Sequence, residues 1–313
     1  MMFAGAMAVA MGVDTTLGWP TRFYTAIGHP VTWLGRLIAA LDARWNRDTA
    51  TTATRRFAGA VAALSVIAAA AIPALAIQSA LPHGWIGAIL TGILAWPLVA
   101  VRSMHDHVDA VAKPLAADDL PGARRAVSMI VGRDPSTLDA AAVARAALES
   151  LAENSSDGIV APLFWGAILG LPGIAAYKAI NTLDSMIGHR TARHEAFGMV
   201  SARIDDVVNL IPARLSGLLF ALASGAPRVA LAVMWRDAGH HRSPNAGWPE
   251  AAMAGALGVR LSGPRIYAGQ LTQEPWVNGA CTDPTPGDLQ RGLALYFRAM
   301  LGLAGGLAAL ALL

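Results

Sequence analysis

Residues 153–177 read ENSSDGIVAPLFWGAILGLPGIAAY, and this stretch decides the fold class. It begins with a glutamate, an asparagine and an aspartate, and an apolar run follows directly. Pro162 and Pro172 interrupt that run, with Gly170 and Gly173 near its middle. Proline and glycine break the backbone hydrogen-bond ladder, which membranes tolerate mainly where protein or a wet cavity covers the break. The stretch therefore predicts a broken, membrane-inserted helix that is preceded directly by side chains with hard oxygen ligands.

The composition is that of a membrane protein. Of the 313 residues, 55% are hydrophobic and 14% are charged, against about 25% charged residues in soluble domains. Cys281 is the single cysteine, so no intrachain disulfide can form, as suits a reducing compartment. The net charge is +3, but the sequence contains no basic run with interleaved aromatics. We therefore expect no nucleic-acid partner.

Apolar segments along the chain predict an all-α, polytopic membrane protein with broken or re-entrant helices and amphipathic cytoplasmic helices. We expect a single membrane-embedded domain over residues 1–313. The expected spans are 1–13, 57–77, 85–101 and 293–313. Because no Lys or Arg precedes the first segment, a short or tilted helix is favoured there over a cleaved signal peptide. Arg298 lies near the start of the last span, where its side chain can snorkel to the interface.

The placement of Lys and Arg indicates how the segments insert. These residues gather in the polar segments 14–56, 102–157, 178–206 and 225–292. If 159–177 crossed fully, the basic segment after it would lie outside, against the positive-inside rule. We therefore favour re-entrant segments at 159–177, turning at Gly170–Gly173, and at 207–223, with two plain crossings as the alternative. This arrangement places the polar segments on the cytoplasmic side of the inner membrane.

Two polar segments have patterns of their own. Residues 139–156 are alanine-rich, with apolar residues at near-helical spacing. Residues 225–290 are rich in Pro, Gly, Trp and Asn, which predicts an ordered loop and then a short helix that opens near Pro249 and Glu250.

Arg145, Glu149, Glu153 and Asp157 recur every four residues, so they share one helix face. For Arg145 and Glu149, a solvated face with one ion pair is the alternative explanation. Glu153 and Asp157 stand where the chain turns apolar, which favours a functional role for these two.

Asparagine and aspartate recur three residues apart in three segments. The pairs are Asn154 with Asp157, Asn181 with Asp184, and Asp206 with Asn209, and Asp205 precedes the last pair. Their oxygens suit Mg²⁺, a hard cation that is usually shared with substrate phosphates. The recurrence predicts a joint polar site at the membrane surface, with four aspartates as metal candidates: Asp157, Asp184, Asp205 and Asp206.

Two cations accompany these pairs. Lys178 is one of two lysines in the chain, and it either holds phosphate or snorkels at the interface. Arg214 lies inside an apolar stretch, where an unpaired charge is costly and indicates function. The sequence has no Gly-Lys-Ser/Thr P-loop, and one cysteine argues against a thiolate zinc site. The histidines at 105, 107, 240 and 241 are expected at the surface or interface.

Five stretches resemble a known family. They are HPVTWLGRLI at 29–38, ESLAENSSDGIVAPLFW at 149–165, AYKAINTLDSMIG at 176–188, SARIDDVVNLIPARL at 201–215 and SPNAGWPEAAMAGALGVRL at 243–261. In this order they resemble the adenosylcobinamide-phosphate synthase family of cobalamin biosynthesis, also called CobD/CbiB. The resemblance implies that ATP and Mg²⁺ drive amide formation between the carboxylate of adenosylcobyric acid and aminopropanol or its phosphate ester. It also implies the bilayer and other cobalamin-pathway enzymes as partners.

The implied chemistry assigns roles to the polar residues. Phosphorylating a carboxylate needs Mg²⁺ and cations to neutralise the transferring group. We expect the oxygen ligands to be Glu153, Asp157, Asp184, Asp205 and Asp206, with Asn154, Asn181 and Asn209. Lys178 and Arg214 then hold phosphate oxygens. The base for the amine is either a carboxylate or His29, which is equally explained as part of a turn that begins a helix.

Asn245, Trp248 and Glu250 are the expected lid over the corrinoid. Three other functions fit parts of the pattern: an intramembrane Mg²⁺-dependent prenyl-type transferase, a corrinoid transporter, and a scaffold for a cobalamin-making complex.

Overall fold

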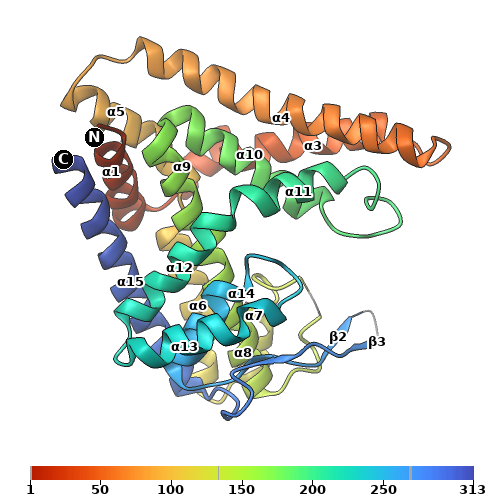
Figure 1. Ribbon diagram of the computed structural model, residues 1–313, viewed down its shortest axis with the longest axis vertical. Coiled ribbons are helices and arrows are strands. Elements are labelled where there is room, and N and C mark those ends of the chain that lie inside the picture. The colour runs from red at the N-terminus through yellow and green to blue at the C-terminus, as the bar shows by residue number, and fades with distance from the viewer. Residues whose placement is uncertain (1, 133, 268–269) are drawn as a thin grey trace. The chain divides into compact units, whose positions relative to one another are not determined.

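The computed structural model describes residues 2–132, 134–267 and 270–313, and within them most of the chain is helical (Figure 1). Met1, the first residue of the expected span 1–13, lies outside the described residues. The first helices are α1 (Met2–Leu17), α2 (Thr21–Ile27), α3 (Pro30–Trp45), α4 (Thr52–Ala80), α5 (Trp85–Ala95), α6 (Val101–Ala116), α7 (Leu120–Val127) and α8 (Ala140–Ser155). The later ones are α9 (Ala161–Leu169), α10 (Leu171–Ile187), α11 (Met199–Val208), α12 (Leu210–Ala223), α13 (Pro227–Asp237), α14 (Gly247–Leu257) and α15 (Pro286–Leu312).

Two short antiparallel ribbons interrupt the helices. In the first, β1 (Leu261–Ser262) pairs with β4 (Trp276–Val277). In the second, β2 (Arg265–Tyr267) pairs with β3 (Gln270–Thr272). The all-α prediction is confirmed, because these strands cover only a few residues of the chain.

The chain folds into two compact units. Unit 1 comprises Met1–Ala100, Ala161–Asn209 and Gly306–Leu313. Unit 2 comprises Val101–Val160 and Leu210–Gly305. The expectation of a single membrane-embedded domain stays a prediction.

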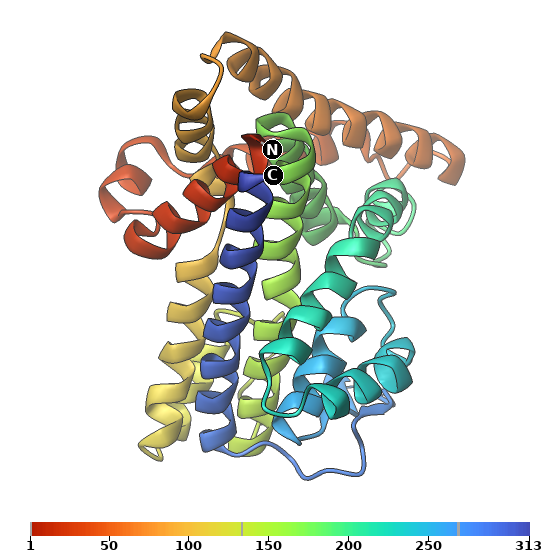
Figure 2. The same cartoon turned by 60° about the vertical axis from the view of Figure 1, so that its left-hand side comes forward.

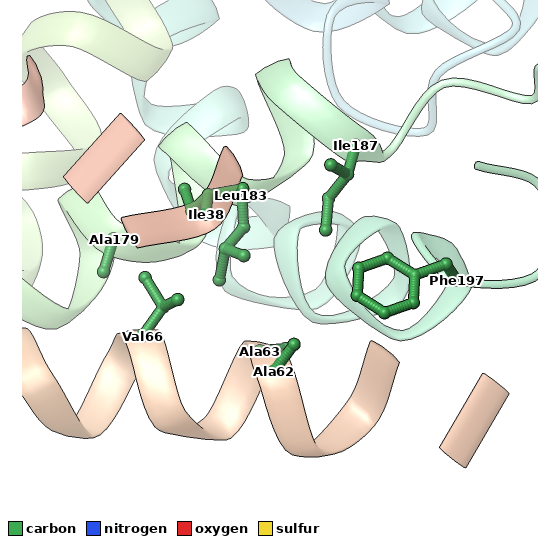
Figure 3. Packing of buried hydrophobic residues seen from close by; sticks show 8 residues of the cluster. All are labelled: Ile38, Ala62, Ala63, Val66, Ala179, Leu183, Ile187 and Phe197. Atoms are coloured by element: carbon green, nitrogen blue, oxygen red, sulfur yellow. The ribbon is translucent and has the colours of Figure 1, made fainter. Parts of the chain in front are cut away.

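The core of unit 1 orients α10. A buried cluster joins α3, α4 and α10 with the loop before α11 (Figure 3): Ile38, Ala62, Ala63, Val66, Ala179, Leu183, Ile187 and Phe197. The small side chains on α4 allow α10 to pack closely against it. Because Leu183 and Ile187 enter this core, the helical period leaves Asn181 and Asp184 on the other side of α10, where both are half-buried.

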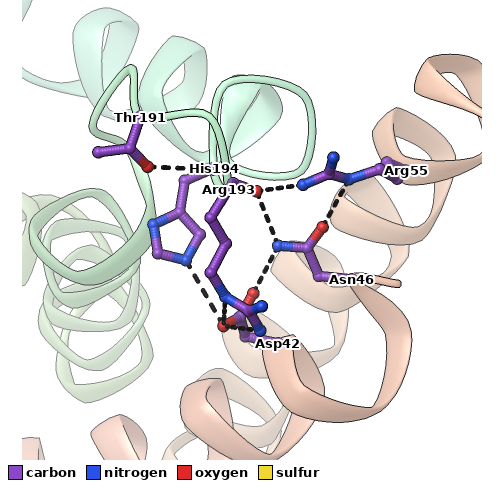
Figure 4. Close-up of polar contacts among 6 residues, drawn as sticks. All are labelled: Asp42, Asn46, Arg55, Thr191, Arg193 and His194. Atoms are coloured by element: carbon purple, nitrogen blue, oxygen red, sulfur yellow. Dashed lines mark hydrogen bonds and ion pairs between the residues drawn. The ribbon is translucent and has the colours of Figure 1, made fainter. Parts of the chain in front are cut away.

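A polar network fastens the loop that follows α10 (Figure 4). Nδ2 of Asn46 donates to the carboxylate of Asp42 (2.7 Å) and to the carbonyl of Arg193 (2.9 Å). The Arg193 guanidinium donates to Asp42 Oδ2 (2.8 and 3.0 Å), and Nε of Arg55 donates to Oδ1 of Asn46 (2.8 Å). Burial tends to raise the pKa of Asp42, but the bonds from Asn46, Arg193 and His194 lower it overall. The network ties the 188–198 loop to α3 and α4.

The predicted break at Gly170–Gly173 is present. Gly170 separates α9 from α10 with φ +72°, a conformation that glycine adopts readily. The backbone N–H of Leu171 donates to Oε1 of Gln78 on α4 (2.6 Å), so a side chain satisfies one of the N–H groups that a helix start leaves unpaired. The chain turns at the predicted residue, while the re-entrant path itself stays a prediction.

In unit 2, α8 is buried along most of its length. Its alanines permit close packing, and the Asp139 carboxylate accepts the N–H of Ala142 (2.8 Å) as an N-cap. The predicted helix over 139–156 is therefore confirmed. α15 runs as one unbroken helix, dark blue in Figure 2, and its Tyr296 hydroxyl donates to the carbonyl of Val101 at the start of α6 (2.7 Å).

Three helical stretches of the described residues are long and apolar enough to cross a membrane. They are Thr52–Ala80, Trp85–Ala116 and Pro286–Leu312. A fourth exists only if α11 and α12 are counted together across the bend at Asn209. The expected first span corresponds to α1, which is apolar but shorter. These helices give the chain the architecture of a polytopic membrane protein.

One expected span is present with a local break, and one prediction of local structure is wrong. The expected span 85–101 lies within the candidate span Trp85–Ala116, in which α5 ends at Ala95 and a 3-10 turn at Trp96–Leu98 contains Pro97. The expected loop at the start of 225–290 contains α13, whose N1 proline and apolar Val and Ala residues favour a helix. The second helix of that segment begins at Gly247, close to its predicted start.

Candidate functional site

The residues expected to form one polar site fall in both units. Unit 1 holds His29, Lys178, Asn181, Asp184, Asp205, Asp206 and Asn209. Unit 2 holds Glu153, Asn154, Asp157, Arg214, Asn245, Trp248 and Glu250. Two of the three Asn–Asp pairs thus belong to one unit, in which α10 packs against α11. A joint site that also includes the third pair stays a prediction.

Asp184 has a perturbed electrostatic environment. Burial raises the pKa of its carboxyl, the nearby charge of Asp206 raises it further, and His189 opposes the rise. Both aspartates are half-buried, so they keep access to solvent. The charge of Asp206 disfavours the ionisation of Asp184, and a bound cation would offset this repulsion.

Asp205 and Asn209 have a different role from Asp206. The Tyr177 hydroxyl on α10 donates to Oδ1 of Asn209 (2.9 Å), and Nδ2 of Asn209 donates to Oδ2 of Asp205 (3.0 Å). All three side chains are buried. This chain of bonds links α10 to α11 and satisfies the Asn209 amide within the protein, so it holds Asp206 in place on α11.

His29 is the N-cap of α3. Its Nδ1 accepts the N–H of Val31 (3.2 Å), and Thr32 completes a capping box. Burial lowers the pKa of the ring, the positive charge of Lys178 lowers it further, and a hydrogen bond with the Pro97 carbonyl opposes both. The turn that begins a helix, one of the two explanations of His29, is therefore present, and it brings the ring near Lys178.

In unit 2, the stretch ENSSDG straddles two kinds of helix. α8 ends at Ser155, and a π-helical turn, Ser156–Val160, follows with Asp157 in it. Such turns occur frequently at functional sites. The Asn154 amide donates back to the carbonyl of Ser150 (2.9 Å), whereas Glu153 is exposed and Asp157 half-buried. Only the amide nitrogen of Asn154 binds its own helix, so the oxygens of all three side chains stay ligand candidates.

Glu149 belongs to a buried cluster that the sequence did not reveal. Its Oε1 accepts the N–H of Ser262 (2.7 Å), 113 residues away in the sequence. The hydroxyl of Ser262 lies 3.4 Å from Oε2 of Glu250, and Nε2 of His241 lies 3.6 Å from Oε1 of Glu250. Both glutamates are buried. Glu250, expected in a lid, instead lies inside unit 2 beside Glu149.

Arg145 is also not on a solvated face. Its guanidinium forms an ion pair with Asp283, and Asp283 accepts two further bonds from Arg260 (2.6 and 3.1 Å). Both arginines stack on the Trp276 ring, with centroid distances of 4.9 and 4.2 Å. The solvated-face explanation for Arg145 and Glu149 is therefore wrong, because each binds the segment after α14.

Arg214 and Trp248 lie together. The Arg214 guanidinium sits 4.3 Å from the centroid of the Trp248 ring, and its Nη1 donates to the Leu210 carbonyl (2.6 Å). Trp235 meets Trp248 edge-on at 4.9 Å. The aromatic face and the carbonyl compensate the arginine charge in its apolar segment. Asn245, three residues before Trp248, is buried.

Within the described ranges, no group of three or more His, Cys, Asp or Glu side chains has the geometry of a metal site. Mg²⁺ usually needs only one or two protein carboxylates, because waters and substrate phosphates supply its other ligands. Asp184 and Asp206 as Mg²⁺ ligands therefore stay a prediction.

Comparisons with known proteins cover almost the whole chain. The family described as CobD/Cbib protein matches residues 7–296. A "Cobalamin biosynthesis protein CobD" of Rhodobacter capsulatus is 69% identical over 97% of this chain and 96% of its own. Proteins of the same name from a Sinorhizobium species and from Brucella suis are each 46% identical, over 98% and 96% of this chain and 98% and 94% of their own. No solved structure gives a significant match.

Proposed function

Because the chain belongs to the CobD/CbiB protein family and has a role in cobalamin biosynthesis, we propose that it is an amide-forming ligase. It joins adenosylcobyric acid to aminopropanol or its O-phosphate, with ATP as the energy source, and gives adenosylcobinamide or its phosphate. The observation that carries the proposal is the half-buried pair Asp184 and Asp206, on neighbouring helices, with Lys178 nearly two turns earlier on α10.

The proposed reaction gives Asp184 and Asp206 a chemical role. A carboxylate resists attack by an amine, so it is first converted to an acyl phosphate by the γ-phosphoryl group of ATP. Negative charge accumulates on the transferring oxygens, and fixed cations placed around it lower the barrier. Lys178 would supply one such charge, and the negative charge of Asp206 beside Asp184 would favour the binding of another.

Mg²⁺ fits this pair of carboxylates. Asp184 and Asp206 would hold it from the protein side, Asn181 would add a neutral oxygen, and phosphate groups would complete the shell. When bound, Mg²⁺ supplies charge neutralisation at the phosphates. The protein's own residues do the remaining work: α10 and α11 fix the carboxylates through Tyr177 and the Asn209–Asp205 bond.

The deprotonation of the amine requires a base. Nδ1 of His29 accepts the N–H of Val31, and burial and the charge of Lys178 lower the pKa of the ring. We therefore assign His29 a positioning role near Lys178 and favour a carboxylate as the base. In unit 2, Glu153 is exposed and Asp157 is half-buried at the π-helical turn, so both are candidates for this role.

The corrinoid is a large flat ring with amide side chains. Trp248, with the Arg214 guanidinium over its ring and Trp235 in a T-shaped contact, offers an aromatic ring and a guanidinium that match these two features. We propose that this face contacts the corrinoid, and that Asn245 and Glu250 shape the wall behind it. The site would face the cytoplasm from the inner membrane, where ATP is available.

A coupled assay tests the proposal. Purified protein is incubated with adenosylcobyric acid, Mg-ATP and aminopropanol phosphate, and product mass and nucleotide products are measured together. The proposal requires one amide product per ADP. A prenyl-type transferase would instead release pyrophosphate from a prenyl donor, a transporter would move corrinoid without ATP-dependent product, and a scaffold would tolerate replacement of the acidic residues.

A further inference from the structure

A cavity in unit 2 lies outside all the residues assigned to the reaction. Its volume is about 360 Å³, within the range of roughly 300–1,000 Å³ for small-molecule sites. The loop between α12 and α13 forms one wall, the end of α14 another, and α15 the third. Arg291 and Arg298 are its charged residues.

The two arginines are fixed in place by helix ends. They are seven residues apart, so they share one face of α15 and are separated by about 10 Å along its axis. Nε of Arg298 donates to the carbonyl of Ala223 at the end of α12 (2.9 Å). Nη2 of Arg291 donates to the carbonyl of Leu257 at the end of α14 (2.8 Å), and its Nη1 bonds Asp288 (2.5 Å).

Helix capping accounts for the bonds from the two arginines to backbone carbonyls, but it leaves the terminal nitrogens of Arg298 without a role. The terminal nitrogens of Arg298 have no hydrogen-bond or ion-pair partner among residues 2–132, 134–267 and 270–313. A guanidinium can donate five hydrogen bonds. Ala226, at the start of α13, also lines the cavity, and its helix begins without a side-chain cap. Positive helix-dipole charge therefore adds to that of the arginines.

The surroundings of the cavity are apolar and exposed. Phe297 and Leu301 flank Arg298 on α15, and each is 57% exposed. Leu222 and Val229 lie on either side of the wall formed by Ser224 to Ala226, and they are 69% and 54% exposed. α15 is a candidate membrane span. Exposed apolar side chains on a candidate membrane span are suited to contact acyl chains, which would bring the charged cavity to the level of the lipid headgroups.

We propose that this cavity binds the phosphate group of an anionic phospholipid. Arg298 and Arg291 contact the phosphate oxygens, and the acyl chains lie over the apolar residues beside them. A basic pocket at a helix interface, next to lipid-facing side chains, is the arrangement that recognises such headgroups. The lipid would lock the ends of α12 and α14 to α15, independently of the proposed ligase chemistry.

Native mass spectrometry of the detergent-purified full chain tests this proposal. We expect phosphatidylglycerol to be retained about tenfold more than phosphatidylcholine, and Arg298→Gln to lower that preference about fivefold, since each basic residue contributes roughly that factor near an anionic headgroup. Arg125→Gln is the matched control, because Arg125 is an exposed unit 2 arginine outside the cavity. It should retain the wild-type preference.

A second variant keeps the test decisive if Arg298→Gln does not fold. The Ser224 hydroxyl accepts the N–H of Ala226 (3.2 Å), and an aspartate at this position can keep that bond while placing negative charge in the cavity. Ser224→Asp should therefore also lose the preference. The proposal is overturned if wild type retains both lipids equally, if the Arg298 and Ser224 variants keep the preference, or if inorganic phosphate displaces phosphatidylglycerol, which would identify a site for soluble phosphate.

Discussion

The carboxylate of Asp184 occupies the space that a side chain at Gly188 would need. A Cβ built on Gly188 would lie 2.0 Å from Oδ1 of Asp184 and 2.7 Å from its backbone carbonyl. The backbone at Gly188 is otherwise ordinary, with φ −74°, so the glycine is required by contact and not by conformation. The last turn of α10 thus fixes the position of the aspartate on which the proposed function depends.

Gly188→Ala should therefore reduce catalysis without unfolding the protein. The added methyl group displaces the Asp184 carboxylate, and we expect kcat to fall about tenfold or more, as misplacement of a catalytic group by about an ångström does. Product formation at saturating substrate measures this. Gly12→Ala is the control, because a Cβ there meets nothing within 4 Å. Equal activity of both variants would show that the carboxylate position is unimportant.

Asp184→Asn should separate stability from activity. Burial and the charge of Asp206 raise the pKa of Asp184, so the folded protein binds this proton more tightly than the unfolded chain. Stability then falls as the pH rises above the ordinary value of 3.8, and at neutral pH the ionised group is destabilising. Without Mg²⁺, the variant should melt at a higher temperature than wild type at pH 7. This difference in melting temperature should become smaller as the pH falls towards 3.8.

Asp184→Asn should also lose most ligase activity, and its remaining activity should respond weakly to Mg²⁺. Thermal unfolding in detergent and a Mg²⁺ titration of product formation measure the two effects. Asp157→Asn tests whether unit 2 shares the metal. Normal product formation by both variants at limiting Mg²⁺ would refute a shared metal site.

Tyr177→Phe should destabilise unit 1. It removes the hydroxyl that donates to buried Asn209, leaving that amide oxygen without its donor, at a cost of about 1–3 kcal/mol. Thermal or denaturant unfolding would register the loss. Tyr24→Phe is the matched control, because Tyr24 is 54% exposed. Equal stability of the two variants would mean that the link between α10 and α11 is not stabilising.

Trp248→Ala should weaken corrinoid binding. Loss of the planar face also releases the Arg214 guanidinium, and we expect KM for the corrinoid to rise about tenfold with a smaller change in kcat. Steady-state kinetics against adenosylcobyric acid measure this. Trp85→Ala, at a tryptophan that is 73% exposed, is the control. An unchanged KM would remove Trp248 from the corrinoid site.

Local chemistry made part of the fold predictable. The break at Gly170 follows from glycine and proline alone, and the helix over 139–156 follows from alanine content and the cap at Asp139. Both signals act within a few residues, so no tertiary information is needed. The helix at Pro227–Asp237 was missed because the surrounding segment is rich in loop-forming residues, which hid its own helical start.

The different contacts that the acidic residues make were not predictable from the sequence. Asp205 and Asp206 are adjacent in the sequence, yet one is bonded to buried Asn209 and the other is half-buried beside Asp184. Glu149 was ambiguous because its partner at Ser262 is 113 residues away. A helical period identifies a shared face, but only packing decides whether that face meets solvent or protein.

The central claim is that ATP phosphorylates the corrinoid carboxylate before the amine attacks it. The most direct measurement uses adenosylcobyric acid labelled with ¹⁸O in both oxygens of that carboxylate, with Mg-ATP and aminopropanol phosphate. We predict that one labelled oxygen leaves in inorganic phosphate for each amide formed, while the other stays in the amide carbonyl. Label in AMP, or amide formation with unlabelled phosphate, would contradict the account.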